Sequence, residues 1–516
     1  MLDVLIVGAG PTGLVLALWL HRQGVRLRIV DKAPGPGTAS RALAVHARTL
    51  EYYAMLGIAD DAILAGRRFD ALNYWTPGRH AARIPVGEIG KGLSPYPYAL
   101  ILPQDEHERL LLGRLKALGV AVEYDTTLVG FDQRPGWIEA EITGPRGEES
   151  VEARFLCGCD GAHSAVREAL GIDFEGGSYS ELFYVADVAA TGPAVNGELH
   201  VFMSGTRFNA VFPMKREGHV RLVGLVPKRL RSKPNLRLED LGADIARETQ
   251  LKLTAVNWFS TYHVHHRVAE SFRLGRAFLL GDAAHIHSPA GGQGMNTGIG
   301  DAVNLAWKLA AVVNTQGSPV LLDSYEDERI RFARTLVAST DRGFAMAVSG
   351  GIFARFLRLR LLPMIVPSLM RLERVRLRLF RTLSQIGITY RGLAPNQGRV
   401  GELAAGDRLP WVGGDDGVGN FGPLRSMSWQ VHVYGAANEE VQSLCKERAL
   451  PLHEQPWKAE TAATGLVRDA LYLIRPDGHI GFAHPTQDVA ALTRYLDAMH
   501  IRTRAEPKQN GRRRYG

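Results

Sequence analysis

The chain has 516 residues, enough for about three domains, and its 46% hydrophobic and 22% charged residues are typical of a soluble globular protein. This composition excludes a collagen, a coiled coil or a largely disordered chain, and the three cysteines exclude a disulfide framework and favour a cytoplasmic location. The net charge is +8, but residues 355–381 carry +7 and residues 502–516 carry +5, so the rest sums to −4. Because no basic stripe runs through the body of the chain, a nucleic-acid-binding protein is not expected.

The first predicted elements are a strand over residues 4–7, a glycine-rich turn and a helix that ends at Gly24. The turn (the first motif, residues 8–13) has the pattern G-x-G-x-x-G, and Asp31 ends the next strand. Glycines at this place allow a pyrophosphate to approach the helix N-terminus, and the acid can bind a ribose. The predicted dinucleotide-binding residues are Gly8, Gly10, Pro11, Thr12, Gly13, Asp31 and Lys32.

The middle of the chain changes from helical to strand periodicity. Residues 38–66 and 104–119 are expected to be mainly helical, and residues 126–156 to form short strands. Alternating segments between residues 180 and 265 predict a mostly antiparallel sheet. Three residues of these segments are candidates either for a substrate pocket or for core packing: Phe202, Phe212 and Met214. The nearby His263, His265 and His266 lack carboxylate or cysteine partners, so no metal site is predicted.

Two further segments indicate ligand chemistry. The second motif (residues 157–167) is a strand-to-helix turn that contains Asp160, with Ser164 as a candidate cap. The third motif (residues 281–296) follows a buried strand and leads into a long helix, whose N-terminus would stabilise negative charge. A ligand that contacts both the first and third motifs must be long, and FAD fits better than NAD. The residues of interest in the third motif are Gly281, Asp282, Pro289, Gly292, Gly294, Met295 and Asn296.

Helices are expected to continue to about residue 390. Within them, residues 355–381 form either a solvated helix face over the core or a contact with a membrane surface or acidic partner. No apolar segment is long enough to span a bilayer. Beyond residue 398 a small α/β domain is predicted, in which a second G-x-G-x-x-G match at residues 417–422 is interpreted as a loop, and residues 503–516 as a disordered basic tail.

The three motifs together resemble the flavoprotein aromatic hydroxylases, the class A FAD-dependent monooxygenases of the p-hydroxybenzoate hydroxylase and phenol hydroxylase type, over roughly residues 1–345. Supporting segments are Ser40-Arg41-Ala42, Pro103-Gln104, Asp301-Ala302, Glu328-Arg329 and Arg475-Pro476-Asp477-Gly478. The resemblance implies an α/β fold: a Rossmann-like FAD-binding domain with an inserted, mostly antiparallel substrate sheet, and a C-terminal thioredoxin-like α/β domain. The implied boundaries are 1–70, 98–180 and 267–395 for the FAD domain, including a helical segment near 340–395, 71–97 and 181–266 for the substrate sheet, and 398–502 for the terminal domain.

The resemblance also implies residue roles. Arg41 and Gln104 lie along the cofactor, and Asp160 belongs to a motif linked to FAD and to the reduced pyridine nucleotide. Asp282 binds the ribityl–pyrophosphate region, while Met295 and Asn296 lie near the pyrimidine edge of the flavin. Arg41 and Pro289 are the candidate catalytic residues, and no catalytic base is assigned.

The implied activity is an FAD-dependent, NADH- or NADPH-consuming monooxygenase that uses O2 and hydroxylates a phenolic or polyketide-like aromatic through a flavin C4a-hydroperoxide. The alternatives are a related epoxidase, Baeyer–Villiger oxygenase or dehydrogenase, and a non-catalytic flavin-binding partner. The substrate, the choice between NADH and NADPH, and the oligomeric state, for which a homodimer is a candidate, stay open.

Overall fold

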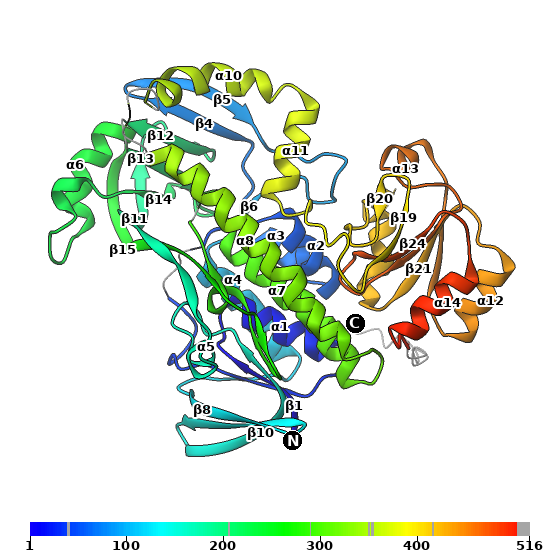
Figure 1. Ribbon diagram of the computed structural model, residues 1–516. Helices are drawn as coiled ribbons and strands as arrows, with labels where there is room; N and C mark the ends of the chain where they lie inside the picture. The colour runs from blue at the N-terminus through cyan, green and yellow to red at the C-terminus, as the bar shows by residue number, and fades with distance from the viewer. Residues whose placement is uncertain are drawn as a thin grey trace, which may run out of the picture. The chain divides into compact units, whose positions relative to one another are not determined.

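A computed structural model gives the fold, which consists of two compact units (Figure 1). The first unit comprises Met1–Ala306 and Tyr325–Ile388, and the second comprises Trp307–Ser324 and the chain from Thr389 onward. The residues that the structure describes are 1–38, 42–204, 207–288, 290–348, 351, 355–414 and 417–502. The predicted catalytic residues Arg41 and Pro289, and the tail at residues 503–516, therefore lie outside the described residues.

A largely parallel sheet forms the centre of the first unit. Its strand order is β16-β17-β10-β1-β2-β7, with β8 and β9 added as antiparallel partners beyond β10. The strands are β1 (Leu2–Val7), β2 (Leu27–Val30), β7 (Val122–Glu123), β8 (Thr127–Arg134), β9 (Trp137–Gly144), β10 (Gly147–Gly158), β16 (Arg273–Leu274) and β17 (Ala277–Leu279). Every residue from Val4 to Val7 is buried, as the continuous apolar run predicts for a strand covered on both faces. The helices α1 (Pro11–Arg22) and α4 (Gln104–Ala117) pack against each other beside it.

A second sheet in the same unit is mostly antiparallel, as predicted. Its order is β18-β15-β11-β14-β13-β12-β4-β5, with one parallel pair between β12 and β4. The strands are β4 (Ala71–Thr76), β5 (Arg79–Pro85), β11 (Phe174–Thr191), β12 (Leu199–Ser204), β13 (Arg207–Pro213), β14 (His219–Leu225), β15 (Lys252–Ala269) and β18 (His285–Ile286). The helix α6 (Leu238–Thr249) packs on one face of this sheet through Leu238, Leu241 and Ile245.

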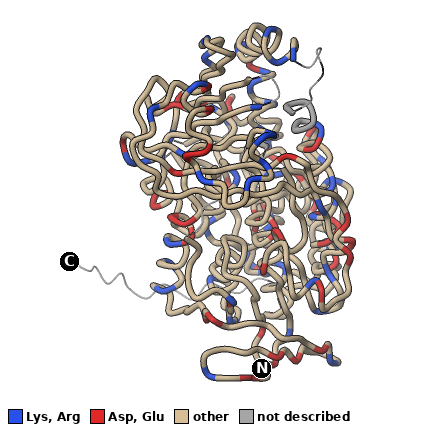
Figure 2. Tube along the Cα trace, turned by 90° about the vertical axis from the view of Figure 1, so that its left-hand side faces the viewer, with Lys and Arg blue, Asp and Glu red and all other residues tan. Residues whose placement is uncertain are grey.

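The first unit contains further α-helices. They are α2 (Ala47–Leu56), α3 (Ala59–Ala65), α5 (Ala165–Ala169), α7 (Gly294–Val313), α8 (Val320–Val348), α10 (Leu362–Leu369) and α11 (Glu373–Leu383), of which α7 and α8 continue into the second unit. Residues 38–66 are thus less helical than predicted, because α2 is preceded by the short strand β3 (Ala44–Val45), which pairs with β6 (Leu100–Ile101). Basic and acidic residues are interspersed along most of the trace (Figure 2).

The second unit contains its own sheet, in the order β20-β19-β24-β23-β21-β22. Its elements are β19 (Gln397–Val400), β20 (Leu403–Ala404), β21 (Gln430–Tyr434), α12 (Glu439–Glu447), β22 (Leu452–Gln455), α13 (Ala459–Ala463), β23 (Leu471–Ile474), β24 (Ile480–His484) and α14 (Val489–Ala498). The second G-x-G-x-x-G match runs from a loop at residues 417–418 into a 3-10 helix (η5, Gly419–Ser426), and it does not lie between a strand and an α-helix.

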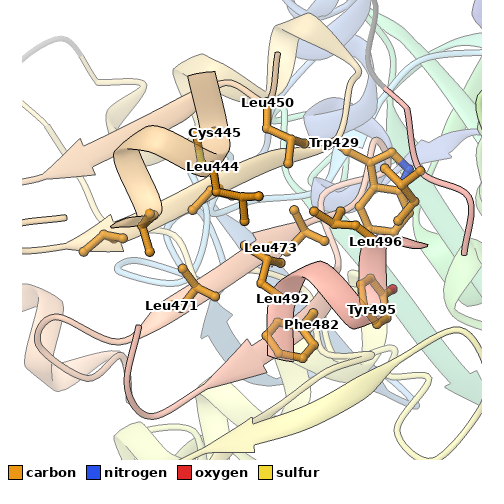
Figure 3. Packing of buried hydrophobic residues seen from close by; sticks show 14 of the residues in the cluster. Trp429, Leu444, Cys445, Leu450, Leu471, Leu473, Phe482, Leu492, Tyr495 and Leu496 are labelled. Carbon is orange, nitrogen blue, oxygen red and sulfur yellow. The ribbon is translucent and has the colours of Figure 1, made fainter. Parts of the chain in front are cut away.

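A hydrophobic cluster fills this unit between its sheet and the helices α12 and α14 (Figure 3). Trp429, Leu473 and Tyr495 belong to it, and the thiol of Cys445 is buried in it. A buried ion pair joins Arg475 to Asp477 at 2.6 Å. The same carboxylate accepts a hydrogen bond from the indole N–H of Trp307 at 3.2 Å, so the hairpin between β23 and β24 holds the α7 end that belongs to this unit.

Candidate functional site

The parallel pairing brings the three motifs to one edge of the central sheet. In β1 the last residue, Val7, pairs with Gly158 of β10 and with Val30 of β2, and Gly158 pairs with Leu279 of β17. The carboxyl ends of these four strands therefore coincide, and the loops that follow them carry the first, second and third motifs. This is the place where open α/β sheets bind ligands.

The glycines of the first motif have two different functions. A Cβ on Gly8, which has φ +104°, would overlap the carbonyl of Cys159, and a Cβ on Gly13 would overlap the carbonyl of Gly8. Those two glycines are thus required by the close approach of the second motif and of the turn itself. Gly10 is different, since a Cβ there would meet no atom within 4 Å although it stands at the N-cap of α1. The space in front of this helix N-terminus is open to a ligand.

Asp31 and Thr12 hold the first motif in place. One carboxylate oxygen of Asp31 accepts a hydrogen bond from the amide of Ala9 at 2.6 Å, and the other from the amide of Ala33 at 2.8 Å. The Thr12 hydroxyl packs against Gly281, where a Cβ would lie 2.7 Å from its Oγ1. The first and third motifs are thus in direct contact, while the neighbouring Lys32 is exposed.

In the second motif, Asp160 mainly organises its own turn. Its carboxylate accepts hydrogen bonds from the Ser164 hydroxyl at 2.6 Å and the Val166 amide at 3.2 Å, at the start of α5. Burial raises the pKa of Asp160, and these hydrogen bonds oppose the rise. Arg167 donates to the carbonyls of Ala162 and Ala283, at 2.9 Å each, and so ties the second motif to the third. The sequence prediction gave Arg167 no role, although an arginine inside an otherwise small-residue motif was a usable signal.

A buried charge network fixes the loop after β17. Asp301 of α7 accepts hydrogen bonds from the Gly281 amide at 3.0 Å, from His285 Nε2 at 2.6 Å and from Arg329 Nε at 2.6 Å. Burial alone would raise the pKa of Asp301, but Arg329 and His285 hold it below its usual value. Within this loop Asp282 is exposed. The network therefore holds the Gly281 backbone rigidly while the adjacent carboxylate faces outward.

The Asn296 side chain is fully used within the protein. Its Oδ1 accepts from the His46 amide at 2.9 Å and from the Thr49 hydroxyl at 2.8 Å, and its Nδ2 donates to the carbonyls of Ala44 at 2.8 Å and Gly292 at 3.0 Å. An amide side chain has two acceptor sites and two donors, so none is left. Asn296 thus joins β3 and α2 to the glycine turn before α7, and only its backbone could serve a ligand.

Two buried histidines stabilise the same region. Burial lowers the pKa of His46 and of His107 to about 4 each, so both rings are neutral near pH 7. His46 Nε2–H donates to the carbonyl of Gly291 at 2.9 Å. The Tyr53 hydroxyl donates to His107 Nε2, which leaves Nδ1–H to donate to Met295 Sδ at 3.3 Å.

Gln104 holds the chain on the other side of the site. Its side-chain oxygen accepts from the Ala42 amide at 3.3 Å, beside the predicted residue Arg41, and its Nε2 donates to Glu108 at 2.8 Å.

Two buried polar atoms immediately before α7 lack a hydrogen-bond partner among the described residues. The Nε2 atom of His287 and the hydroxyl of Ser288 are buried and have no hydrogen-bond partner in the part of the chain that the structure describes. His287 Nδ1 lies 2.7 Å from the Ser288 carbonyl and must carry the proton, so Nε2 presents a lone pair. A Cβ on Gly294 would lie 3.7 Å from that Nε2. An orphaned acceptor beside a helix N-terminus fits a polar ligand and, with the open space at Gly10, fits a cofactor as long as FAD.

The predicted pocket residues lie on opposite faces of the second sheet. Phe212 pairs with Arg221 and shares its face, where Arg221 binds Asp187 through two contacts of 2.6 Å. Phe202 packs instead into the core beneath α6 and stacks on Trp75 with ring centroids 5.2 Å apart. Phe202 thus follows the core-packing alternative, whereas Phe212 stays a candidate for the pocket, because the register places the two side chains on different faces. Met214 lies in the turn after β13, and its backbone amide donates to the backbone carbonyl of His219 at 3.2 Å.

Among the described residues, no group of three or more His, Cys, Asp or Glu side chains is arranged to hold a metal ion. The same described residues contain no helix that is both long and apolar enough to cross a bilayer.

The fold and this edge of the sheet define a Rossmann-type protein with a site for a long dinucleotide. The profile of the family described as FAD binding domain matches residues 1–340. A flavin-dependent monooxygenase of Mycobacteroides abscessus is 34% identical over 502 residues, which cover 93% of this chain and 96% of that protein. The 6-methylpretetramide 4-monooxygenase of Streptomyces rimosus is 37% identical over 346 residues, 67% of this chain and 62% of its own length.

Among solved structures, the OxyS anhydrotetracycline hydroxylase from Streptomyces rimosus superimposes with a TM-score of 0.77 and 29% identity, covering 97% of this chain and 99% of that one. The chain belongs to the family of class A FAD-dependent aromatic monooxygenases. It is an FAD enzyme of the type that uses NADH or NADPH as reductant.

Proposed function

We propose that the protein hydroxylates a phenolic or polyketide-like aromatic substrate with O2 and NADPH or NADH. The observation that carries the proposal is the convergence of the three motifs at one sheet edge, where Gly10 leaves a helix N-terminus open and His287 presents an unpaired acceptor. Two relatives support the substrate class, since their names give 6-methylpretetramide and anhydrotetracycline as substrates.

The residues that would hold FAD follow from the loops that meet at this edge. The α1 N-terminus at Gly10 offers amide donors and a positive dipole end to the pyrophosphate, and Asp31 lies beside it for the ribose. Asp282 is exposed toward solvent at the end of β17 and suits the ribityl region. The α7 N-terminus at Gly294 would stabilise negative charge on the reduced ring. When bound, FAD supplies the activation of O2, while the protein positions the ring and excludes water.

We also propose His287 as the proton acceptor for the substrate hydroxyl. A phenolate is more reactive toward an electrophilic oxygen than a phenol, so hydroxylation needs a group that takes this proton. His287 has a lone pair on a buried Nε2 next to Gly294, so an acceptor lies at the N-terminus of α7. The Ser288 hydroxyl, also buried and unpaired among the described residues, is the nearest group in sequence that could relay the proton.

The domain plan from the sequence is kept as a proposal. The second unit supports a thioredoxin-like assignment through its connectivity: β21 and β22 are parallel around α12, and β23 lies antiparallel to both β21 and β24 before α14. Its only cysteine, Cys445, is buried in the core, so a thiol–disulfide reaction is not part of the proposal. A cytoplasmic location and a homodimer likewise stay predictions.

The proposal is tested with the purified, FAD-loaded protein and a panel of phenols and polycyclic phenolic compounds. Substrate-stimulated NAD(P)H oxidation with a product heavier by one oxygen atom is expected for at least one compound. If the purified protein contains no flavin and cannot bind added FAD, an FAD-dependent activity is excluded. Oxidation of the compound without incorporation of oxygen would favour a dehydrogenase. If no compound stimulates NAD(P)H oxidation, a non-catalytic flavin-binding partner would be favoured.

A further inference from the structure

The segment of residues 355–383, here called the α10–α11 segment, exposes an unusual amount of apolar surface. Fifteen large hydrophobic side chains are exposed among the described residues, and eight of them lie in this segment. Met364 is 73% exposed, Phe356 56% and Leu372 55%, and the other five are Leu362, Ile365, Leu369, Val375 and Leu379. Soluble proteins rarely gather exposed apolar side chains in this way unless the surface meets a partner.

Unpaired positive charge lies beside these apolar side chains. Six arginines of the segment are exposed, and none of them forms an ion pair with an acidic side chain in the part of the chain that the structure describes: Arg355, Arg360, Arg371, Arg374, Arg378 and Arg381. Glu373 is the only acidic residue of the segment. Elsewhere exposed arginines are commonly paired, as Arg134 is with Asp132 and Glu139. The segment therefore carries both an apolar surface and a field that attracts anions.

The two properties occupy adjacent faces of the same helix. Leu372, Val375 and Leu379 recur at intervals of three and four residues and form one exposed stripe along α11. Arginines with the same spacing form the neighbouring stripe, from Arg371 to Arg381. An exposed apolar stripe beside a basic face is the pattern of helices that lie in a membrane interface.

The opposite side of the segment is firmly attached to the protein. Phe380 packs so closely on Gly90 that no Cβ could be accommodated there, and Met370 joins the same cluster. Beyond α11, the side-chain amide of Gln385 donates to the Thr297 hydroxyl at 2.8 Å in the first turn of α7. The exposed stripe is thus presented outward by a helix whose core contacts are already satisfied, and α10 lies over β5 (Figure 1).

We propose that the α10–α11 segment docks on the surface of an anionic lipid bilayer. A second copy of the chain would place the same six arginines against one another in a two-fold interface, which their repulsion opposes. A nucleic acid would neutralise the arginines but leave the aliphatic stripe in contact with water. A bilayer satisfies both features, because phosphate headgroups pair with arginine while Met364, Leu372 and Leu379 enter the acyl boundary.

The test is co-sedimentation of the full-length, FAD-loaded protein with two kinds of vesicle. One is pure phosphatidylcholine, and the other contains about one third phosphatidylglycerol. Binding is expected only to the anionic vesicles, and it should fall severalfold when salt rises from about 0.05 M to about 0.5 M, since screening shortens the reach of the arginines. Failure to sediment with anionic vesicles at the lower salt would overturn the proposal.

Two pairs of substitutions separate charge from apolar contact. Arg374→Glu with Arg378→Glu should weaken partition to anionic vesicles by roughly 30-fold or more, at about 1 kcal/mol per arginine. Met364→Ser with Leu372→Ser should weaken it at both salt concentrations. The matched controls are Arg331→Glu with Arg334→Glu on the exposed side of α8, and Leu64→Ser, whose side chain is 75% exposed.

Flavin absorbance and the thermal midpoint show whether each variant is folded. Equal loss of binding in the control and segment variants would contradict the assignment to this segment. A parent protein that elutes as a dimer, and becomes a monomer with Met364→Ser and Leu372→Ser while binding no vesicles, would assign the surface to a second copy and overturn the proposal.

Discussion

Gly10 is the residue at which the predicted cofactor site can be tested with the least disturbance of the fold. Because a Cβ there meets no protein atom within 4 Å, Gly10→Val should lower the free energy of unfolding of the cofactor-free protein only by the cost of valine at an N-cap, about 1 kcal/mol. The added side chain occupies the space in front of α1, so the amount of FAD that co-purifies should fall at least about tenfold, the equivalent of about 1.4 kcal/mol.

The matched control for this prediction is Gly113→Ala in α4. That glycine also has open space around its Cβ, and its replacement should retain FAD and stabilise the helix by about 0.5–1 kcal/mol. Flavin absorbance after desalting measures the outcome. Full FAD occupancy in Gly10→Val would show that the pyrophosphate lies elsewhere.

His287 allows the chemical step to be separated from cofactor binding. His287→Leu removes the orphaned Nε2 acceptor and keeps an apolar side chain of similar volume. The variant should keep FAD, while the rate of product formation at saturating substrate falls by roughly 100-fold, the usual contribution of a general base. The exposed His263→Leu serves as control. Product analysis by mass spectrometry decides, and parent-like hydroxylation by His287→Leu would remove this residue from the mechanism.

At the scale of elements, the attachment of α7 and α8 to the loop after β17 depends on Asp301. Asp301→Asn keeps the shape but removes the charge that pairs with the fully buried Arg329. Breaking a buried pair in this way should lower the free energy of unfolding by about 3–5 kcal/mol and loosen FAD, since one of the two oxygens that accept from the Gly281 amide, His285 and Arg329 becomes an NH2 donor.

Urea unfolding of the Asp301→Asn variant is compared with that of Asp132→Asn, an exposed ion pair with Arg134 whose loss should cost at most about 1 kcal/mol. Equal destabilisation by the two substitutions would show that the hydrogen bonds of Asp301 do not stabilise the loop after β17.

Local pattern was sufficient to predict β1, the glycine turn and α1, because each signal lies within a few residues of the element it specifies. It could not separate the glycines by function, since Gly8 is required by the carbonyl of Cys159 in a distant part of the chain, and Gly13 by the carbonyl of Gly8 in the folded turn. The side-chain partners of Asn296 could not be predicted for the same reason, because Ala44 and Thr49 are distant in sequence.

Which face of a strand becomes buried likewise depends on elements outside that strand. Alternation in β12 and β13 indicates that neighbouring side chains point in opposite directions, but it does not say which face a helix will cover. Phe202 is buried because α6 covers its face, whereas Phe212 shares the face of Arg221. His287 escaped prediction because an unpaired buried nitrogen is a property of the assembled site and has no sequence pattern.

For the whole molecule, buried histidines predict loss of stability in mild acid. Burial lowers the pKa of His46, His107 and His287 to about 4, below the ordinary value of about 6.5 in an unfolded chain. Between these values the unfolded chain binds more protons than the folded protein, so stability is full above about pH 6.5 and falls as the pH decreases toward 4. The raised pKa of Asp160 acts in the opposite sense in stronger acid, so the clearest window is from about pH 6.5 to about pH 5.

Urea unfolding across this window is expected to show a lower free energy of unfolding at the acid end, with a smaller change in His107→Gln, which lacks one of the titrating rings. A free energy of unfolding that is constant from pH 7 to pH 5 would contradict the burial of these histidines as neutral rings.

The central claim is that this molecule transfers one oxygen atom from O2 to an aromatic ring with FAD bound at the edge where the three motifs meet. Its most direct test is one turnover experiment with ¹⁸O2, NAD(P)H and a phenolic compound that stimulates the oxidation of NAD(P)H. The parent protein is expected to form a product that carries one ¹⁸O atom, and Gly10→Val, which lacks FAD, is expected to form none. A product with oxygen derived from water, or an oxidised product with no added oxygen, would contradict it.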